Sequence, residues 1–181
     1  TCGEIPYLEF GRQWGEPIPH VIDTHRMLGY PEMLEIGNVT ARAKDKLLRN
    51  SAAFWHTDQA YDADPATTTM LYARKVPELG GETLVVDMKA AYDDLDAATK
   101  QKIDGLKAKH LYGATSGRGG EEPTRALNKA QAAATPPTLH PLVRPHTVTG
   151  QKALYGVAGT AYGIEGIEMD DADRLISDLK A

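Results

Sequence analysis

The sequence is short of cysteine, of basic residues and of long apolar runs, and each shortage excludes a class of protein. Cys2 is the single cysteine, so no internal disulfide can form and the chain suits a reducing compartment. Its 20 Lys and Arg residues are outnumbered by 25 Asp and Glu residues, which leaves a formal net charge of −5. That balance excludes the basic surface of a protein that binds nucleic acid or an anionic membrane. No apolar run approaches the roughly 20 residues of a membrane-spanning helix.

What is present is typical of an ordinary globular protein. Hydrophobic residues make up 41% and charged residues 25% of the 181 positions. A chain of this length can bury a sizeable core as one domain. The first residues lack the charged-then-apolar pattern of a signal peptide. We therefore expect a single cytoplasmic domain over residues 1–181, without a nucleic-acid or membrane partner, and association into a homo-oligomer is left open.

The alternation of apolar and polar residues predicts many short strands with helices inserted among them. The predicted strands are residues 18–22, 33–39, 55–61, 67–76, 82–86, 139–144 and 152–157, with a turn at 149–150 between the last two. The predicted helices are residues 7–14 (beginning before Thr1 and closed by Gly15), 87–95 and 96–109, with Asp87 and Asp96 as the N-caps of the last two. A final helix is predicted after Asp170 or Asp171 as its cap, with Leu175, Ile176 and Leu179 on its apolar side. This order favours an antiparallel β-sandwich or jelly roll, because a parallel sheet needs strands that alternate regularly with helices.

One long connection, residues 113–135, is rich in Gly, Ala, Thr and charged residues and shows little periodicity. A connection of this length in a compact domain is usually a cover over a functional site or a disordered segment. We predict a mobile active-site loop here, with simple disorder as the alternative.

The stretch Phe54-Trp55-His56-Thr57-Asp58 places a histidine and a carboxylate two residues apart. In an extended strand the side chains at positions i and i+2 point to the same face, so His56 and Asp58 would converge. An imidazole and a carboxylate together suit a divalent first-row metal, and they are two of the three ligands in the facial triad of non-haem Fe(II) oxygenases. The motif is short, however, and a buried histidine bonded to an aspartate is the alternative.

Further motifs follow in a fixed order, namely GGETL at 80–84, AAY at 90–92, HPLVR at 140–144 and GQKALY at 150–155. With WHTD, this ordered set resembles the taurine dioxygenase family of Fe(II)- and 2-oxoglutarate-dependent oxygenases, which includes the 2,4-dichlorophenoxyacetate dioxygenases. The resemblance runs from about Trp14 to the end of the chain. It implies a mixed α/β, mainly β fold, which is a double-stranded β-helix (jelly roll, cupin-like) with inserted helices.

The resemblance also implies roles for individual residues. His56 and Asp58 match the family's first two iron ligands, and Thr83 matches the residue that hydrogen-bonds the distal carboxylate of 2-oxoglutarate. His20 matches, more loosely, a histidine that helps to hold the acidic substrate. The implied reaction uses Fe(II), 2-oxoglutarate and O2 to hydroxylate a small acidic organic substrate, with release of succinate and CO2. Residues 113–135 fall where family members have a mobile cover.

Two departures concern the substrate. The taurine enzymes have an asparagine three residues before the motif tryptophan, where this chain has Ala52. The phenylalanine that closes their pocket falls near Thr160 or Ala161. A taurine pocket is therefore not supported, and another sulfonate, a carboxylic acid or an aryloxy acid stays open.

The remaining histidines are not predicted to be metal ligands. His140 and His146 belong to a segment that is a structural strand in the family pattern. His110 is expected at a helix end, and His25 has no assigned role.

The family's third iron ligand, a downstream histidine, and the arginine that clamps 2-oxoglutarate have no match in this sequence. By the resemblance, roughly another 80 residues would follow Ala181 in a whole jelly roll. We therefore expect an oxygenase domain that is incomplete at its C-terminal end, and a 181-residue chain that is inactive alone. Two alternatives stay open, namely a non-catalytic metal- or ligand-binding β-sandwich and an inert fragment of such an oxygenase.

Overall fold

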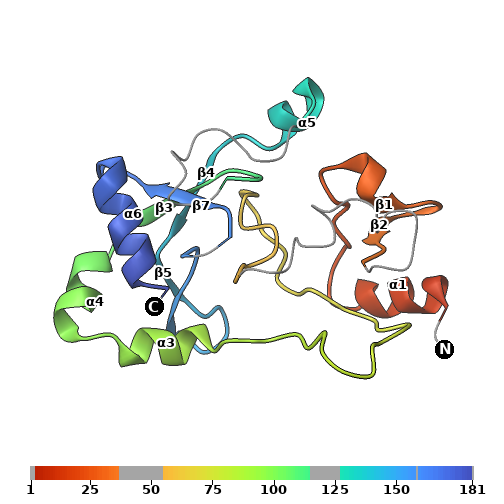
Figure 1. Ribbon diagram of the computed structural model, residues 1–181, viewed down its shortest axis with the longest axis horizontal. Helices are drawn as coiled ribbons and strands as arrows, with labels where there is room; N and C mark the ends of the chain where they lie inside the picture. Colours follow the sequence, from red (N-terminus) through yellow and green to blue (C-terminus); the bar gives the residue numbers. More distant parts are fainter. Residues whose placement is uncertain (1–2, 37–54, 115–126, 158, 181) are drawn as a thin grey trace. The chain divides into compact units, whose positions relative to one another are not determined.

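The computed structural model describes residues 3–36, 55–114, 127–157 and 159–180, and the chain forms two compact units (Figure 1). The first unit takes residues 1–54 and 66–83, and the second takes residues 55–65 and 84–181. Within the described ranges, no helix is both long enough and apolar enough to cross a bilayer.

The first unit begins with helix α1, Glu4–Arg12, which starts inside the chain and not before Thr1 as the sequence predicted. Gly3 caps it without a side-chain hydrogen bond, and a turn follows through Gly15, whose φ is +139°. Leu8 is its buried residue. The helix is tied to the later part of the unit because the Tyr7 hydroxyl donates to the Met70 carbonyl at 2.7 Å.

A short antiparallel hairpin follows among the described residues of this unit. A 3-10 turn, η1, spans Asp23–His25, and the strands β1 (Arg26–Met27) and β2 (Tyr30–Leu34) follow it. The predicted strand at 33–39 thus begins earlier, and residues 37–39 lie outside the described ranges.

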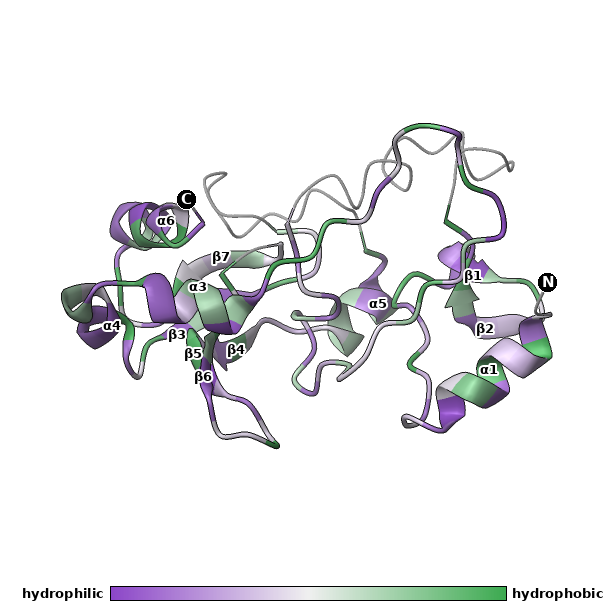
Figure 2. Cartoon of the chain, turned by 90° about the horizontal axis from the view of Figure 1, so that it is seen from below, coloured by the Kyte–Doolittle hydropathy of each residue, from purple (hydrophilic) through white to green (hydrophobic). Residues whose placement is uncertain are grey.

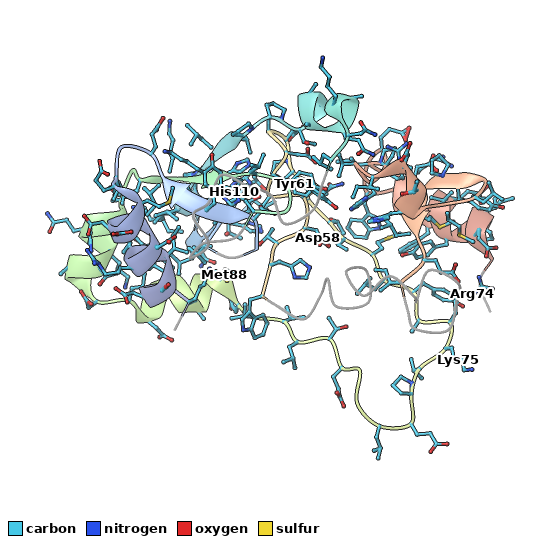
Figure 3. The ribbon with its side chains drawn as sticks, turned by 45° about the horizontal axis from the view of Figure 1, so that its top comes forward. Asp58, Tyr61, Arg74, Lys75, Met88 and His110 are labelled. Carbon is cyan, nitrogen blue, oxygen red and sulfur yellow. The ribbon has the colours of Figure 1, made fainter. Side chains whose placement is uncertain are left out.

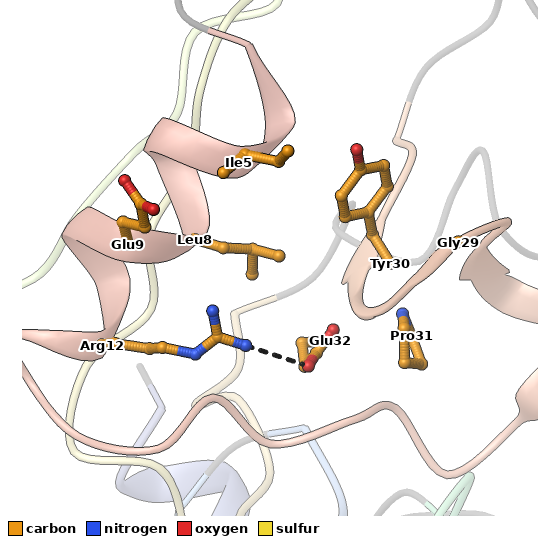
Figure 4. Close-up of a pocket in the computed structure, with 8 residues that line it drawn as sticks. All are labelled: Ile5, Leu8, Glu9, Arg12, Gly29, Tyr30, Pro31 and Glu32. Carbon is orange, nitrogen blue, oxygen red and sulfur yellow. Dashed lines mark hydrogen bonds and ion pairs between the residues drawn. The ribbon is translucent and has the colours of Figure 1, made fainter.

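An open pocket of about 250 Å³ lies between α1 and the hairpin (Figure 4). Its lining residues are Ile5, Leu8, Glu9, Arg12, Gly29, Tyr30, Pro31 and Glu32. Arg12 spans this pocket to Glu32, with 3.5 Å between Nη2 and Oε1.

The second unit is built on a three-stranded antiparallel sheet in the order β4-β3-β7. The central strand β3 is Lys107–His110, and its neighbours are β4 (Thr138–Pro141) and β7 (Ala161–Ile164). A separate hairpin pairs β5 (Val143–Pro145) with β6 (Lys152–Leu154), joined by the predicted turn at 149–150. The predicted strand 139–144 is therefore divided between two sheets.

Two helices precede the sheet, α3 (Met88–Asp94) and α4 (Ala97–Ile103). Their aspartate caps are confirmed, because the carboxylates of Asp87 and Asp96 accept backbone N–H bonds from the first turns. The predicted helix 96–109 is too long. It ends at Ile103, and Gly105 takes a φ of +78° before the chain enters β3.

A third helix, α5 (Lys129–Ala134), lies in the segment that the sequence predicted to be a loop. It is held by a capping box between Asn128 and Gln131. Residues 115–126 lie outside the described ranges, and the role of residues 113–135 as a mobile cover stays a prediction.

The last helix, α6 (Met169–Asp178), lies against β7 (Figure 1). It begins at Glu168, so Asp170 and Asp171 occupy its first turn and do not cap it. Its apolar side is confirmed, and the division between polar and apolar residues can be followed in Figure 2. The core that it covers contains Ile103, Ala108, Leu142, Leu154, Val157, Ala161, Ile164, Ala172, Leu175 and Ile176.

Several predicted strands are not strands in this structure, namely residues 18–22, 55–61, 67–76 and 82–86. Their residues have suitable propensities, but strand propensity depends on neighbours that complete the ladder and cover the side chains. Those neighbours are missing among the described residues, and Leu84 and Val85 are 72% and 89% exposed.

The packing of α6 gives a direct test of this core. Ile176→Ala should lower the free energy of unfolding by about 2–5 kcal/mol, because it removes a fully buried side chain and leaves a cavity. Ser177→Ala, at the exposed neighbouring position, is the control and should change stability by less than about 0.5 kcal/mol. Urea unfolding measures both, and equal stabilities would contradict this packing.

Candidate metal-binding site

His56 and Asp58 converge as the sequence predicted. His56 Nε2 lies 3.2 Å from Asp58 Oδ1, and the side chains are 37% and 46% exposed. Both groups therefore reach solvent while they stay close enough to share one ion. Phe54 and Ala52, at the start of the motif, lie outside the described ranges.

The backbone that brings them together is not the predicted strand. Residues 55–57 are irregular, and a turn begins at Asp58. Gln59 has a φ of +55°, and the Asp62 N–H donates to its carbonyl at 2.9 Å. Tyr61 anchors the turn, because its ring contacts that of Tyr112 edge to face with 4.9 Å between the ring centroids. Asp58 and Tyr61 are labelled in Figure 3.

A glycine packs closely against the backbone of His56. Gly159 has a φ of +68°, and a Cβ at this position would lie 2.9 Å from His56 Cβ and 3.3 Å from its Cα. A side chain is thus excluded both by the backbone conformation and by the space. Gly159 consequently forms the wall behind the first predicted ligand.

Two buried histidines lie in the sheet of the same unit. His110 is fully buried at the end of β3, not at a helix end as predicted, and His140 is 6% exposed in β4. Their rings meet edge to face with 5.4 Å between centroids. His110 Nδ1 lies 3.0 Å from the Thr160 hydroxyl, and His140 Nε2 donates to the Asp62 carbonyl at 2.8 Å.

Burial sets the protonation state of His110. It lowers the pKa of the imidazole to about 4, and a smaller effect in the same direction comes from the charge of His140. His110 Nε2 has no hydrogen-bond partner among the described residues, and it faces Gly156, where a Cβ would lie only 2.6 Å away. His110 is therefore neutral at physiological pH.

The other predicted site residues, Thr83 and His20, belong to the first unit. Thr83 is exposed and in no regular element. His20 Nδ1 accepts the Ile22 N–H at 3.1 Å, and its ring stacks on that of His25 with 5.2 Å between centroids. The structure thus brings together His56 and Asp58, which share a unit, and leaves the roles of Thr83 and His20 as predictions.

One imidazole nitrogen and one carboxylate oxygen at this separation suit Fe(II) as two ligands of a facial triad. No group of three or more His, Cys, Asp and Glu side chains with metal-binding geometry occurs in the part of the chain that the structure describes. The donor set therefore fits such an ion in type, and it could supply two of the coordination positions.

Sequence reasoning missed the surroundings of these two side chains. Gly159 packs against His56, yet it is about 100 residues away from it in the sequence. The residue after Gly159, Thr160, contacts His110, and the Asp62 carbonyl in the turn after Asp58 accepts a hydrogen bond from His140. The sequence does carry a signal for Gly159, since Gly156 and Gly159 lie between the strands β6 and β7. A glycine in such a place often marks a point where another part of the backbone comes close.

Comparison with solved structures identifies the class of fold. A taurine dioxygenase from Burkholderia xenovorans matches 98% of this chain and 54% of its own, with a TM-score of 0.65 and 24% identity. The structure of AAD-2 in complex with Mn(II) and N-oxalylglycine matches 70% of this chain and 48% of its own, with a TM-score of 0.60 and 34% identity. The predicted jelly-roll fold with inserted helices is confirmed, with sheets that are not closed among the described residues.

Comparison of sequences then gives the family. The family described as taurine catabolism dioxygenase TauD, TfdA family matches residues 6–181, and the chain belongs to it. The α-ketoglutarate-dependent 2,4-dichlorophenoxyacetate dioxygenase of Burkholderia sp. (strain RASC) is 32% identical over 164 residues. The match covers 83% of this chain and 52% of that protein, so the chain spans about half the length of this curated relative.

The depressed pKa of His110 predicts how stability depends on pH. The unfolded chain takes up a proton near the ordinary pKa of 6.5, whereas folded His110 does so only near 4. The contribution of His110 is therefore complete above pH 6.5 and is lost as the pH falls toward 4. Between pH 7 and pH 5 it should lower the free energy of unfolding by about 2 kcal/mol.

Denaturant unfolding at the two pH values measures this loss, and His110→Asn isolates it. Asparagine keeps a polar group near the position of Nδ1 and does not titrate, so the loss between pH 7 and pH 5 should shrink by the same amount. An unchanged loss in the variant would show that His110 is not the responsible group.

Proposed function

We propose that the whole protein is an Fe(II)- and 2-oxoglutarate-dependent dioxygenase that hydroxylates a small acidic organic substrate and releases succinate and CO2. The observation that carries this proposal is the convergence of His56 and Asp58 at 3.2 Å in a chain whose family match spans residues 6–181. Convergence alone would fit a structural contact. Membership of a family of dioxygenases makes an iron site the better interpretation.

His56 and Asp58 would hold the ion through Nε2 and a carboxylate oxygen. When bound, Fe(II) supplies the activation of O2 and the oxidative decarboxylation of 2-oxoglutarate. The partial exposure of both side chains leaves room for the co-substrate and substrate to approach. The wall formed by Gly159 restricts approach from behind His56. The third ligand that the family resemblance implies has no match in this sequence, so activity is proposed for the whole protein and not for these residues alone.

Thr83 and His20 are proposed to act on the two organic acids. The Thr83 hydroxyl would donate a hydrogen bond to the distal carboxylate of 2-oxoglutarate, and its exposed position leaves it free to do so. His20 would hold the acid group of the substrate. In the described structure, its Nδ1 accepts the Ile22 N–H at 3.1 Å.

The substrate class is proposed to be an aryloxy or other carboxylic acid, or a sulfonate other than taurine. The acidic 2,4-dichlorophenoxyacetate in the name of a relative that is 32% identical supports the first of these. The cytoplasmic location and the homo-oligomer stay predictions.

Loss of either proposed ligand should abolish coupled and uncoupled turnover. In the whole protein with Fe(II), succinate release from labelled 2-oxoglutarate should fall at least about 100-fold in His56→Ala and in Asp58→Ala, the upper range for lost metal-site partners. His146→Asn is the matched control. His146 is exposed and accepts the Val148 and Thr149 N–H groups through Nδ1, a position that asparagine can imitate.

The contrary result is equally clear. If the wild-type protein does not decarboxylate 2-oxoglutarate, a non-catalytic β-sandwich is the better description. The same holds if His56→Ala leaves the metal content of the protein unchanged.

The role of Thr83 predicts a selective loss of co-substrate affinity. Thr83→Val removes the hydroxyl and keeps the shape, so the KM for 2-oxoglutarate should rise about 10-fold or more, as expected for a hydrogen bond to a charged group. Thr83→Ser keeps the hydroxyl and should stay near the wild-type value. Initial rates at varied 2-oxoglutarate measure both, and equal KM values for the two variants would rule out this role.

A further inference from the structure

The histidines that the metal site does not use are placed where they support it. His110 and His140 are buried in adjacent strands and contact each other, yet neither belongs to a group of three metal-binding side chains among the described residues. A buried polar ring is costly unless its contacts are useful. Among the described residues, the His110 ring contacts the Thr160 hydroxyl, next to Gly159, which packs against His56, and the His140 ring contacts the Asp62 carbonyl in the turn after Asp58.

The first connection runs to the wall behind His56. His110 Nδ1 lies 3.0 Å from Thr160 Oγ1, and the Leu111 N–H donates to the Thr160 carbonyl at 3.2 Å. Thr160 is therefore held by both its side chain and its backbone. The residue before it, Gly159, is the one that packs within van der Waals distance of the His56 backbone.

The second connection runs to the turn after Asp58. His140 Nε2 donates to the Asp62 carbonyl at 2.8 Å, and the Asp62 N–H closes the turn on Gln59. That turn contains the positive φ of Gln59, a conformation that a residue with a side chain adopts only when its surroundings impose it. His140 supplies one such contact from β4.

We propose that His110 and His140 are positioning residues that hold the His56–Asp58 segment from its two ends in the geometry that binds the metal. The inference rests on the proposed function, since it assigns the metal to these two side chains. Neither histidine touches the metal. His110 acts through Thr160 and Gly159 on His56, and His140 acts through Asp62 on Asp58.

The test is metal affinity, measured in the whole protein without turnover. Co(II) is the probe, because its visible absorption reports both binding and ligand geometry. Thr160→Val and His140→Leu remove the two hydrogen bonds, and each should weaken Co(II) binding about 10-fold, the lower end for outer partners of metal ligands. Thr160→Ser keeps the hydroxyl, and His140→Gln keeps a hydrogen-bond donor near the position of Nε2. Both variants should therefore bind Co(II) with an affinity within about twofold of the wild type.

Loss of stability alone is separated by a control in the same unit. Ile176→Ala weakens the core without touching either connection, and below its unfolding temperature it should bind Co(II) like the wild type. If Ile176→Ala loses affinity as much as Thr160→Val, general destabilisation explains the effect and the proposal is overturned. Wild-type affinity in both Thr160→Val and His140→Leu overturns it too. If His140→Leu does not fold, the comparison of Thr160→Val with Thr160→Ser decides alone.

His56→Ala distinguishes a failure of this inference from a failure of the proposed function. If the wild type binds no Co(II), or if His56→Ala binds it equally well, the metal site itself is wrong and both proposals fall. If His56→Ala loses the metal while the hydrogen-bond variants keep it, only the positioning role is wrong.

Discussion

The antiparallel pairing of β3 with β4 on one side and with β7 on the other is the constraint on which the site depends. It sets Ala108 opposite His140 and His110 opposite Ala161. The two histidines are thereby diagonal neighbours on one face, which is close enough for their rings to meet. A slip of either strand by one residue would turn its own histidine to the opposite face and separate the two rings. The register of three short strands therefore decides whether the metal-ligand segment meets any support.

The parts of this fold that the sequence predicted correctly depend on residues close together in the chain. The caps at Asp87 and Asp96 and the apolar side of α6 are of this kind. The incorrect predictions depend on distant partners. Residues 67–76 and 82–86 have the composition of strands, but a strand also needs a neighbour, and no pattern within the segment identifies one. The end of α4 was missed for a local reason, since Gly105 was available as a stop signal.

The site shows the same division in a sharper form. The convergence of His56 and Asp58 was predicted from strand geometry, yet the structure achieves it with an irregular segment and a turn. The prediction held because residues two apart can meet in more than one conformation. Two contacts with this segment come from residues about 80 to 100 positions away, namely Gly159, which packs against His56, and His140, which donates to the Asp62 carbonyl. The family resemblance indicates His56 and Asp58 as candidate ligands. It assigns no role to His110 and His140, because neither matches a ligand of the family.

The proposed ligands, His56 and Asp58, are partly exposed, whereas the histidines proposed to position them, His110 and His140, are buried. In the proposed function, a metal and two organic acids must reach His56 and Asp58, which fits the partial exposure of both side chains. Exposed side chains are poorly fixed by their own packing. His110, in the sheet of the same unit, is fully buried, and its low pKa keeps the ring neutral. A neutral ring makes its contact to Thr160 without the cost of a buried charge, and that contact does not change over the physiological pH range. The order needed at the exposed ligands is thus supplied by the folded core beneath them, before any metal arrives.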